Sequence, residues 1–218
     1  MLRLPKRFGQ HMQGFILSLQ PVRDEDLWVS VLTSEALLSL YRFYGVRHSV
    51  IALGHKIDFC AKTQGKRGIL CLRDVLHLGF LWEEERSKKL VWQEFVRLLF
   101  AHLKDVEHIE DFYYALLCEM AHKMSKQNPH RIACEAYAKI LAFEGRANAL
   151  EHCFVCGNPL GARCALGRAL LGICEHCLQG DVAAFETQKI SYFLRNSDAM
   201  LLEDREIAKL WSVVARGL

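Results

Sequence analysis

The hydrophobic pattern changes its period once along the chain. Up to about residue 82, short runs rich in β-branched and aromatic residues alternate with glycine-containing turns, which is typical of strands. From Glu83 onward the apolar residues recur every three or four positions, which is typical of amphipathic helices. The pattern therefore predicts an α+β protein, with a β-rich domain over residues 12–82 and a helical domain over residues 83–218.

The β-rich region contains six strand candidates. They span residues 15–19, 27–33, 37–44, 49–53, 56–61 and 69–72. No connection is long enough for a helix that would join parallel neighbours, so five or six of these segments should form a small antiparallel sheet or barrel. A closed barrel is favoured because closure removes the exposed strand edges.

The helical region shows several separate apolar stripes, which we interpret as core-facing. Two of them predict helices over residues 90–103 and 106–124. Asn128 and Pro129 predict the N-cap and first turn of a third helix that stops at Gly145. Two further helices are expected over residues 181–194 and from about residue 197 to residue 214.

Four cysteines between the third and fourth predicted helices form two pairs. The pairs Cys153-x-x-Cys156 and Cys174-x-x-Cys177 are separated by seventeen residues, which is the spacing of a four-thiolate zinc site. Zn²⁺ prefers four such donors in a tetrahedron, and four thiolates leave no open position for a catalytic water. The sequence therefore predicts a structural zinc loop over residues 151–178, inserted in the helical domain.

The alternatives to this zinc site are four ordinary buried cysteines or two disulfides. Disulfides are rare in reducing compartments, which disfavours the second alternative. Cys164, His152 and His176 lie close enough in sequence to be rival ligands, but each would break the symmetric pairing.

Charge is distributed unevenly over the 218 residues. Residues 1–82 carry eleven Lys and Arg against six Asp and Glu, a balance of +5, whereas the remainder carries seventeen against nineteen, a balance of −2. This asymmetry indicates a polyanionic partner for the N-terminal region. Residues 1–11 form a basic lead-in without the apolar stretch of a signal peptide, and no apolar run is long enough for a membrane span. We therefore expect a cytoplasmic protein.

No group of residues predicts a catalytic site. The sequence has no phosphate-binding glycine loop and no nucleophile elbow, and no two histidines are spaced as in a zinc protease. The three consecutive acids Asp24, Glu25 and Asp26 are interpreted as a solvated turn. A binding function is the expectation that remains, and the protein is not expected to be an enzyme.

Basic and aromatic residues alternate in the β-rich region, as they do in proteins that bind nucleic acids. Basic groups neutralise phosphates, and exposed aromatic rings stack on bases. Phe59, with either Tyr41 or Phe43, is expected in the core and not on a base-stacking surface, because alternate strand residues face opposite ways. The candidate DNA-binding residues are Arg42, Arg47, Lys56, Lys62, Lys66 and Arg67.

The order of these features over residues 12–215 resembles the bacterial RecO family of recombination mediators. The resemblance rests on Gly14-Phe15-Ile16-Leu17, the acidic turn with Asp24 and Asp26, Gly45-Val46-Arg47, the helical domain and the paired cysteines. It implies an N-terminal OB-fold β-barrel followed by an α-helical domain with a zinc loop. It also implies binding of single- and double-stranded DNA at the nucleoid, strand annealing, and loading of RecA together with RecR and the single-strand DNA-binding protein.

Two other functions stay open. One is a zinc-stabilised protein-interaction adaptor that does not bind DNA, and the other is an enzyme with an unrecognised active site. Salt-dependent binding of single-stranded DNA would distinguish the first from a recombination mediator.

Overall fold

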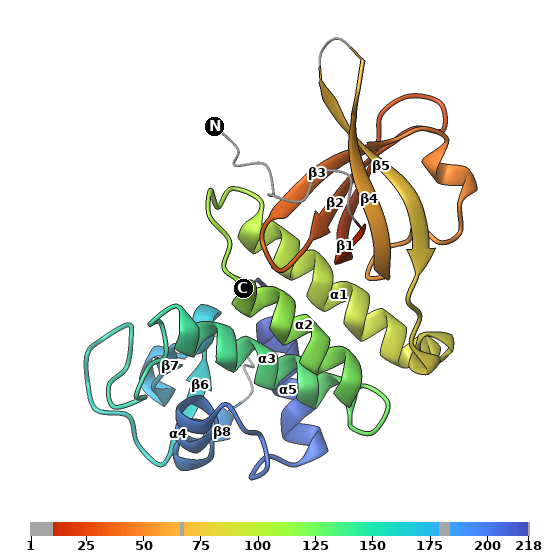
Figure 1. The fold of residues 1–218 in the computed structure, drawn as a ribbon. Helices are drawn as coiled ribbons and strands as arrows, with labels where there is room; N and C mark the ends of the chain where they lie inside the picture. The colour runs from red at the N-terminus through yellow and green to blue at the C-terminus, as the bar shows by residue number, and fades with distance from the viewer. Residues whose placement is uncertain (1–10, 66–67, 179–183, 218) are drawn as a thin grey trace. The chain divides into compact units, whose positions relative to one another are not determined.

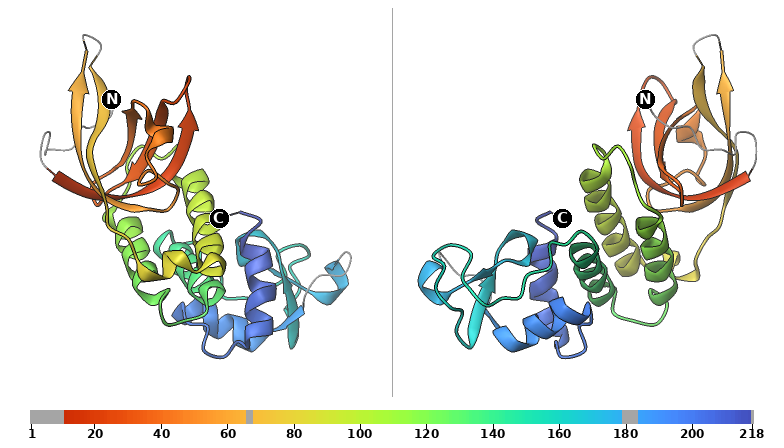
Figure 2. Two further views of the ribbon diagram at one scale, coloured as in Figure 1. Left: turned by 90° about the vertical axis from the view of Figure 1, so that its right-hand side faces the viewer. Right: turned by 60° about the vertical axis from the view of Figure 1, so that its left-hand side comes forward.

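The computed structural model of the chain describes residues 11–65, 68–178 and 184–217. It divides into two compact units, Met1–Ser125 and Lys126–Leu218, which are drawn in Figure 1 and Figure 2. Of the predicted basic lead-in, all but His11 lies outside the described residues. Within the described part of the chain, no helix is long and apolar enough to cross a membrane.

The first unit begins with a closed five-stranded barrel, which confirms the predicted fold class. Its strands follow one another round the barrel in the order β1-β2-β3-β5-β4, and β3 and β5 form the one parallel pair (Figure 1). This is the arrangement of an OB-fold barrel. The strands are β1 (His11–Pro21), β2 (Leu27–Leu32), β3 (Leu37–Arg42), β4 (Lys56–Gln64) and β5 (Ile69–His77).

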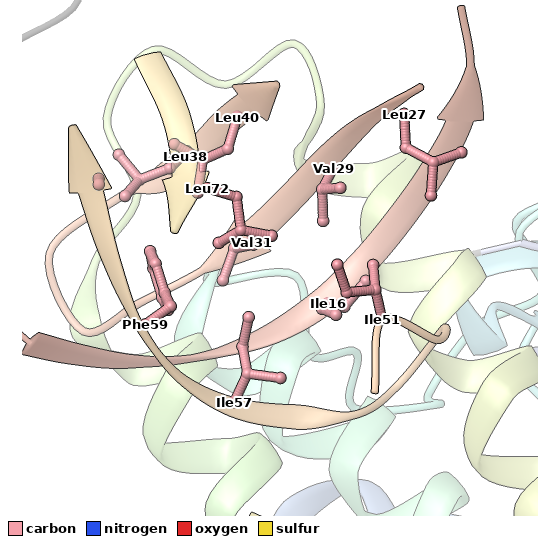
Figure 3. Packing of buried hydrophobic residues seen from close by; sticks show 11 residues of the cluster. Ile16, Leu27, Val29, Val31, Leu38, Leu40, Ile51, Ile57, Phe59 and Leu72 are labelled. Carbon is pink, nitrogen blue, oxygen red and sulfur yellow. The ribbon is translucent and has the colours of Figure 1, made fainter. Parts of the chain in front are cut away.

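The barrel core is built from alternate residues of the strands, as the period of two predicts. Figure 3 shows their side chains pointing toward one another inside the barrel, Phe59 among them. Tyr41 is also buried, but its ring contacts those of Trp28 and Phe43 instead of this cluster. The labelled core residues are Ile16, Leu27, Val29, Val31, Leu38, Leu40, Ile51, Ile57, Phe59 and Leu72.

The strand predicted over residues 49–53 is wrong. This segment is a succession of turns, in which the amide of Ile51 donates to the carbonyl of His48 at 2.9 Å and the amide of His55 donates to that of Ala52 at 3.1 Å. The five other segments already close the barrel, so a sixth strand would find no free edge. Ile51 is apolar because its side chain fills the barrel interior, where it is 6% exposed.

Two helices complete the first unit. The 3-10 helix η2 (Leu81–Glu84) leads into α1 (Arg86–Leu103), and α2 (Asp111–Lys123) follows; both α-helices pack against β1. The indole of Trp92 on α1 donates to the carbonyl of Gly54 at 2.9 Å. A Cβ at Gly54 would lie 2.5 Å from that indole nitrogen, so glycine is required for this approach. The hydrophobic period thus changes at Glu83, whereas the compact unit extends to Ser125.

The second unit combines three helices with a small sheet. As predicted, Asn128 caps α3 (Pro129–Phe143), its side-chain oxygen accepting from the amide of His130 at 3.0 Å. The chain leaves this helix at Gly145, where φ is 68°. The three-stranded sheet has the order β7-β6-β8. The other elements of this unit among the described residues are β6 (Arg163–Leu166), β7 (Gly172–Ile173), β8 (Ala184–Glu186), α4 (Thr187–Asn196), α5 (Asp204–Val214) and the 3-10 helices η3 (Arg168–Leu170) and η4 (Glu175–Cys177).

Both predicted C-terminal helices start later than expected. Residues 179–183 lie outside the described residues, and 184–186 form β8, in which Phe185 pairs with Cys164 of β6, so α4 begins only at Thr187. The last helix begins at Asp204, because a capping box between Glu203 and Glu206 fixes its start. Phe185, Ala199 and Leu202, which precede these starts, are buried from strand or turn conformations, whereas Leu201 is 45% exposed.

Candidate nucleic-acid interface and metal centre

An open pocket of about 380 Å³ lies on the barrel where β3 and β5 run side by side. It combines positive charge with aromatic surface, since two arginines and two aromatic residues face it. Phe43 is 40% exposed and Tyr44 is 59% exposed. The lining residues are Arg42, Phe43, Tyr44, His48, Gln64 and Arg73.

The aromatic side of the pocket is fixed by packing with its neighbours. The rings of Trp28 and Tyr41 meet edge to face with centroids 5.2 Å apart, and those of Tyr41 and Phe43 do so at 4.8 Å. Such pairs are a preferred arrangement of aromatic rings. Phe43 is therefore held as an ordered surface on which a flat group can stack.

The acidic turn positions the loop that carries Tyr44. The Asp26 carboxylate accepts from the Tyr41 hydroxyl at 2.5 Å and from the Tyr44 amide at 2.8 Å. The hydroxyl bond, followed by the amide bond, lowers the pKa of Asp26. Tyr44 has a left-handed backbone with φ of 54°, which is uncommon for a residue other than glycine. Asp26 is therefore a structural anchor and not only the solvated residue that the sequence suggested.

Two arginines form the basic side of the pocket. Arg42 donates from Nη1 to the carbonyl of Leu72 at 3.0 Å, while its buried Nε has no hydrogen-bond partner among the described residues. Burial, and then the nearby charge of Arg73, lower the pKa of Arg42. Arg73 lies over the ring of Phe43, 5.8 Å from its centroid, and donates to Gln64. An anion bound between the two guanidinium groups would relieve their repulsion.

The structure brings some of the predicted DNA-binding residues to this surface. Arg42 lines the pocket, and Arg47 borders it, lying over the Tyr44 ring at 5.4 Å while pairing with Glu25. Lys62 is exposed on β4 and pairs with Asp74 at 3.2 Å. Lys66 and Arg67 lie outside the described residues.

Lys56 is placed apart from the others. Its ammonium lies over the rings of Phe15 and Tyr114, at 5.6 Å and 5.7 Å from their centroids, and 3.7 Å from the sulfur of Cys118 on α2. It therefore faces α2 and does not line the pocket. Its neighbourhood in the sequence gave no sign of this, because α2 comes more than fifty residues later in the chain.

Arg73 was missed by the sequence analysis. The last strand was expected to end at Leu72, whereas β5 continues to His77. The pairing of Tyr41 with Cys71 then brings Arg73 near Arg42 and Phe43. The sequence gives no clear signal of the longer strand, because Arg73 and Asp74 are both polar and Val75 and Leu76 are both apolar, so the alternation stops at Leu72.

The four paired cysteines converge on one point, as their spacing predicts. The four sulfurs lie within 4.8 Å of one another, and those of Cys156 and Cys174 are 3.7 Å apart. A tetrahedron with metal–sulfur bonds of about 2.3 Å has edges of about 3.8 Å. All nine cysteines of the chain are free thiols, which excludes the alternative of two disulfides. The four sulfurs can hold one metal ion.

Two tight turns position the four cysteine sulfur atoms. In the first, the amide of Gly157 donates to the carbonyl of Cys153 at 2.9 Å, and Gly157 has φ of 74°. In the second, the amide of Cys177 donates to the carbonyl of Cys174 at 3.1 Å, and the amide of Cys174 donates to the Cys153 sulfur at 3.3 Å. Gly172, just before the second turn, leaves room for the side chain of Leu160, since a Cβ there would lie 2.5 Å from its methyl group.

The pKa values of the clustered thiols are also compatible with binding of a metal ion. The amide of Cys174, assisted by other backbone amides, lowers the pKa of the Cys153 thiol to about 6. Hydrogen bonds with the Cys156 and Cys174 sulfurs raise the pKa of Cys177 to about 12. Four crowded thiolates repel one another, so full ionisation requires a cation at their centre.

The rival ligands lie outside this cluster. Cys164 is buried in β6 and pairs with Phe185 across the sheet, and burial raises the pKa of its thiol. His152 forms a bridge with Pro159, and neither it nor His176 belongs to the group of converging ligand atoms among the described residues. The symmetric pairing of the four cysteines is therefore the arrangement that the structure shows.

Comparison with known families identifies the barrel. Residues 12–83, about a third of the chain, match the family model described as RecO N terminal. No curated protein matches the chain. The matched residues are those of the barrel and the start of η2, including the pocket, the acidic turn and the loop between them.

Proposed function

Because residues 12–83 match the family model described as RecO N terminal, we propose that this chain belongs to the RecO family and is a recombination mediator that binds DNA during repair. The observation that carries the proposal is the pocket on the barrel, where Arg42 and Arg73 lie beside the exposed rings of Phe43 and Tyr44. Charge and stacking surface at one place are what an unpaired strand requires.

Single-stranded DNA uses both sides of the pocket. A phosphate lies between the two guanidinium groups, which releases counterions and removes their mutual repulsion. A neighbouring base stacks on Phe43 or Tyr44, whose faces any base can use, so binding is independent of sequence. Duplex DNA offers phosphates but no free base faces, so it binds through the arginines and through Arg47 and Lys62 alone.

This binding mode supports strand annealing. Neutralised phosphates let two complementary strands approach, and stacked, unpaired bases stay available for pairing. We further propose that the protein acts at the nucleoid in the cytoplasm with RecR and the single-strand DNA-binding protein to load RecA. Its role is to bind and present DNA, not to catalyse a covalent step.

The four-cysteine centre has a structural role in this proposal. Zn²⁺ is the ion that best suits four thiolates in a tetrahedron, and a site without an open position holds the fold together. It links the turn after α3 to the strand pair β6–β7 within the second unit. We therefore propose one structural zinc ion at Cys153, Cys156, Cys174 and Cys177.

A protein-interaction adaptor is the second candidate. It is favoured by Phe154 and Val155, which lie between the first two cysteines and are 68% and 62% exposed. Exposed apolar residues on a rigid turn are typical of contact surfaces. An adaptor would use this turn and would not bind naked DNA.

An annealing assay with two matched variants tests the proposal. The parent protein should accelerate annealing of complementary oligonucleotides that are coated with single-strand DNA-binding protein. Arg73→Glu, which reverses charge in the pocket, should lose most of this acceleration. Arg97→Glu makes the same change at an exposed position on α1 and should keep it. Equal activity of the two variants, or no binding of naked DNA by the parent protein, would favour the adaptor.

A further inference from the structure

A second group of metal-ligating side chains lies in the first unit and shares no residue with the pocket. His55 precedes β4, His77 ends β5 and Glu83 belongs to η2. The imidazole rings of His55 and His77 are stacked, with centroids 3.9 Å apart and planes 15° apart. The Nε2 of His77 is 3.0 Å from a Glu83 carboxylate oxygen. One ligand atom from each residue lies within 4.8 Å of the other two.

The tautomer of His55 is set by its backbone neighbour. Its Nδ1 lies 3.0 Å from the carbonyl oxygen of Val50, and the ring is 9% exposed. A carbonyl oxygen only accepts hydrogen bonds, so Nδ1 carries the proton and Nε2 keeps its lone pair. A histidine oriented by a backbone carbonyl in this way is the usual arrangement of a metal ligand.

Glu83 supplies the charge that a cation needs. Its side chain is 13% exposed, and its Oε1 has no hydrogen-bond partner among the described residues. A buried carboxylate oxygen without a hydrogen-bond partner is energetically unfavourable. A bound cation would satisfy this oxygen and the Nε2 of His55 together.

The three residues are held by regular structure. The carbonyl of His55 accepts from the amide of Ile16 on β1 at 3.0 Å, and His77 pairs with Ile57 across β4 and β5. A Cβ at Gly79 would lie 3.1 Å from the His77 ring, so this glycine leaves room for the imidazole. The site is therefore built on the ends of barrel strands and not on an isolated loop.

We propose that His55, His77 and Glu83 form a second metal site, which takes a divalent transition-metal ion such as Zn²⁺. Two imidazoles and one carboxylate suit such an ion, and three protein ligands leave a coordination position for water. Parallel rings direct their lone pairs side by side, so His77, which is 25% exposed, rotates out of the stack when the ion binds. The ion would join the segment before β4 to the end of β5 and to η2.

The competing explanation needs no metal. A stacked neutral His55 beside a His77–Glu83 ion pair would bind only protons. The two explanations differ in metal stoichiometry, because the four-cysteine centre accounts for one ion and the second site for another.

The test is a calorimetric titration with Zn²⁺ of full-length protein that already contains one zinc ion per chain. The parent protein should bind one further equivalent. Glu83→Gln, which keeps the size of the side chain but removes its charge, should not bind it, and neither should His77→Gln. The matched controls are Glu84→Gln and His108→Gln, both at exposed positions, which should bind it as the parent does.

Two results would overturn the proposal. One is a parent protein that takes up no second equivalent, and the other is a second equivalent that persists in both Glu83→Gln and His77→Gln, which would make it an adventitious ion only. Circular dichroism shows whether the variants fold. If neither variant folds, NMR spectra of the parent test the proposal instead. The ring resonances of His55 and His77 must shift on addition of Zn²⁺ if these rings bind the ion.

Discussion

The pocket and the four-cysteine centre are assembled in opposite ways. All four clustered cysteines come from residues 153–177, and two tight turns place them. The pocket gathers residues from β3, β4, β5 and the loop after β3, and it depends on Asp26 from yet another loop. The spacing of residues in the sequence determines a local site, whereas the register of the strands determines a site that spans several strands. We therefore expect metal binding to be lost when one cysteine is replaced. We expect DNA binding to be weakened when charge or aromatic surface is removed from a barrel that still folds.

Removal of a cysteine ligand should have the largest effect. Cys174→Ser leaves three thiolates, and because metal binding and folding are coupled, the second unit should lose several kcal/mol of stability. The barrel, which lies in the other unit, should keep its fold and its DNA binding. Metal analysis and thermal unfolding measure these effects. Cys164→Ser is the control, since Cys164 is outside the cluster and the variant should keep the metal.

Loss of an aromatic ring from the pocket should have an intermediate effect. Tyr44→Ala should weaken binding of single-stranded DNA by about 1–3 kcal/mol, or roughly 5- to 150-fold, because a stacked base loses its partner. Duplex binding should change little, since paired bases offer no free face. Fluorescence anisotropy with both DNA forms measures the difference. Phe154→Ala removes an aromatic residue of the second unit that is even more exposed than Tyr44, and it should leave both affinities unchanged.

The same contrast explains what the sequence could predict. The cysteine spacing was sufficient to predict that the four sulfurs converge, because two residues between paired cysteines favour a tight turn. Alternation located five barrel strands, but it also suggested one over 49–53, where Ile51 is apolar for a different reason. The residues that line the pocket depend on strand register and tertiary packing. Arg73 lies at the pocket and Lys56 faces α2, and neither position can be predicted from the local sequence pattern.

Removal of the Asp26 carboxylate should have the smallest effect, and its effect on stability should depend on pH. The pKa of Asp26 is lowered from its ordinary value of 3.8 by the Tyr41 hydroxyl and the Tyr44 amide. Because the folded pKa is depressed, the stabilisation is complete above the ordinary value and is lost as the pH falls through the folded pKa. The stability advantage of the parent over Asp26→Asn should therefore be constant near neutral pH and shrink below about pH 4.

Urea unfolding over a pH series measures this advantage. Asp24→Asn, an exposed neighbour in the same turn, serves as the control and should follow the parent. If the stability advantage of the parent over Asp26→Asn does not change between neutral and acidic pH, the carboxylate does not anchor the loop.

The central claim is that the pocket on the barrel binds the DNA backbone. Its most direct test is the affinity for a labelled single-stranded oligonucleotide, measured over a series of salt concentrations for the parent, Arg73→Glu and Arg97→Glu. If a phosphate lies between Arg42 and Arg73, Arg73→Glu should bind more weakly and its logarithmic salt slope should fall by about one, while Arg97→Glu keeps the slope of the parent. Identical slopes for all three proteins would contradict the claim and place the DNA on another surface.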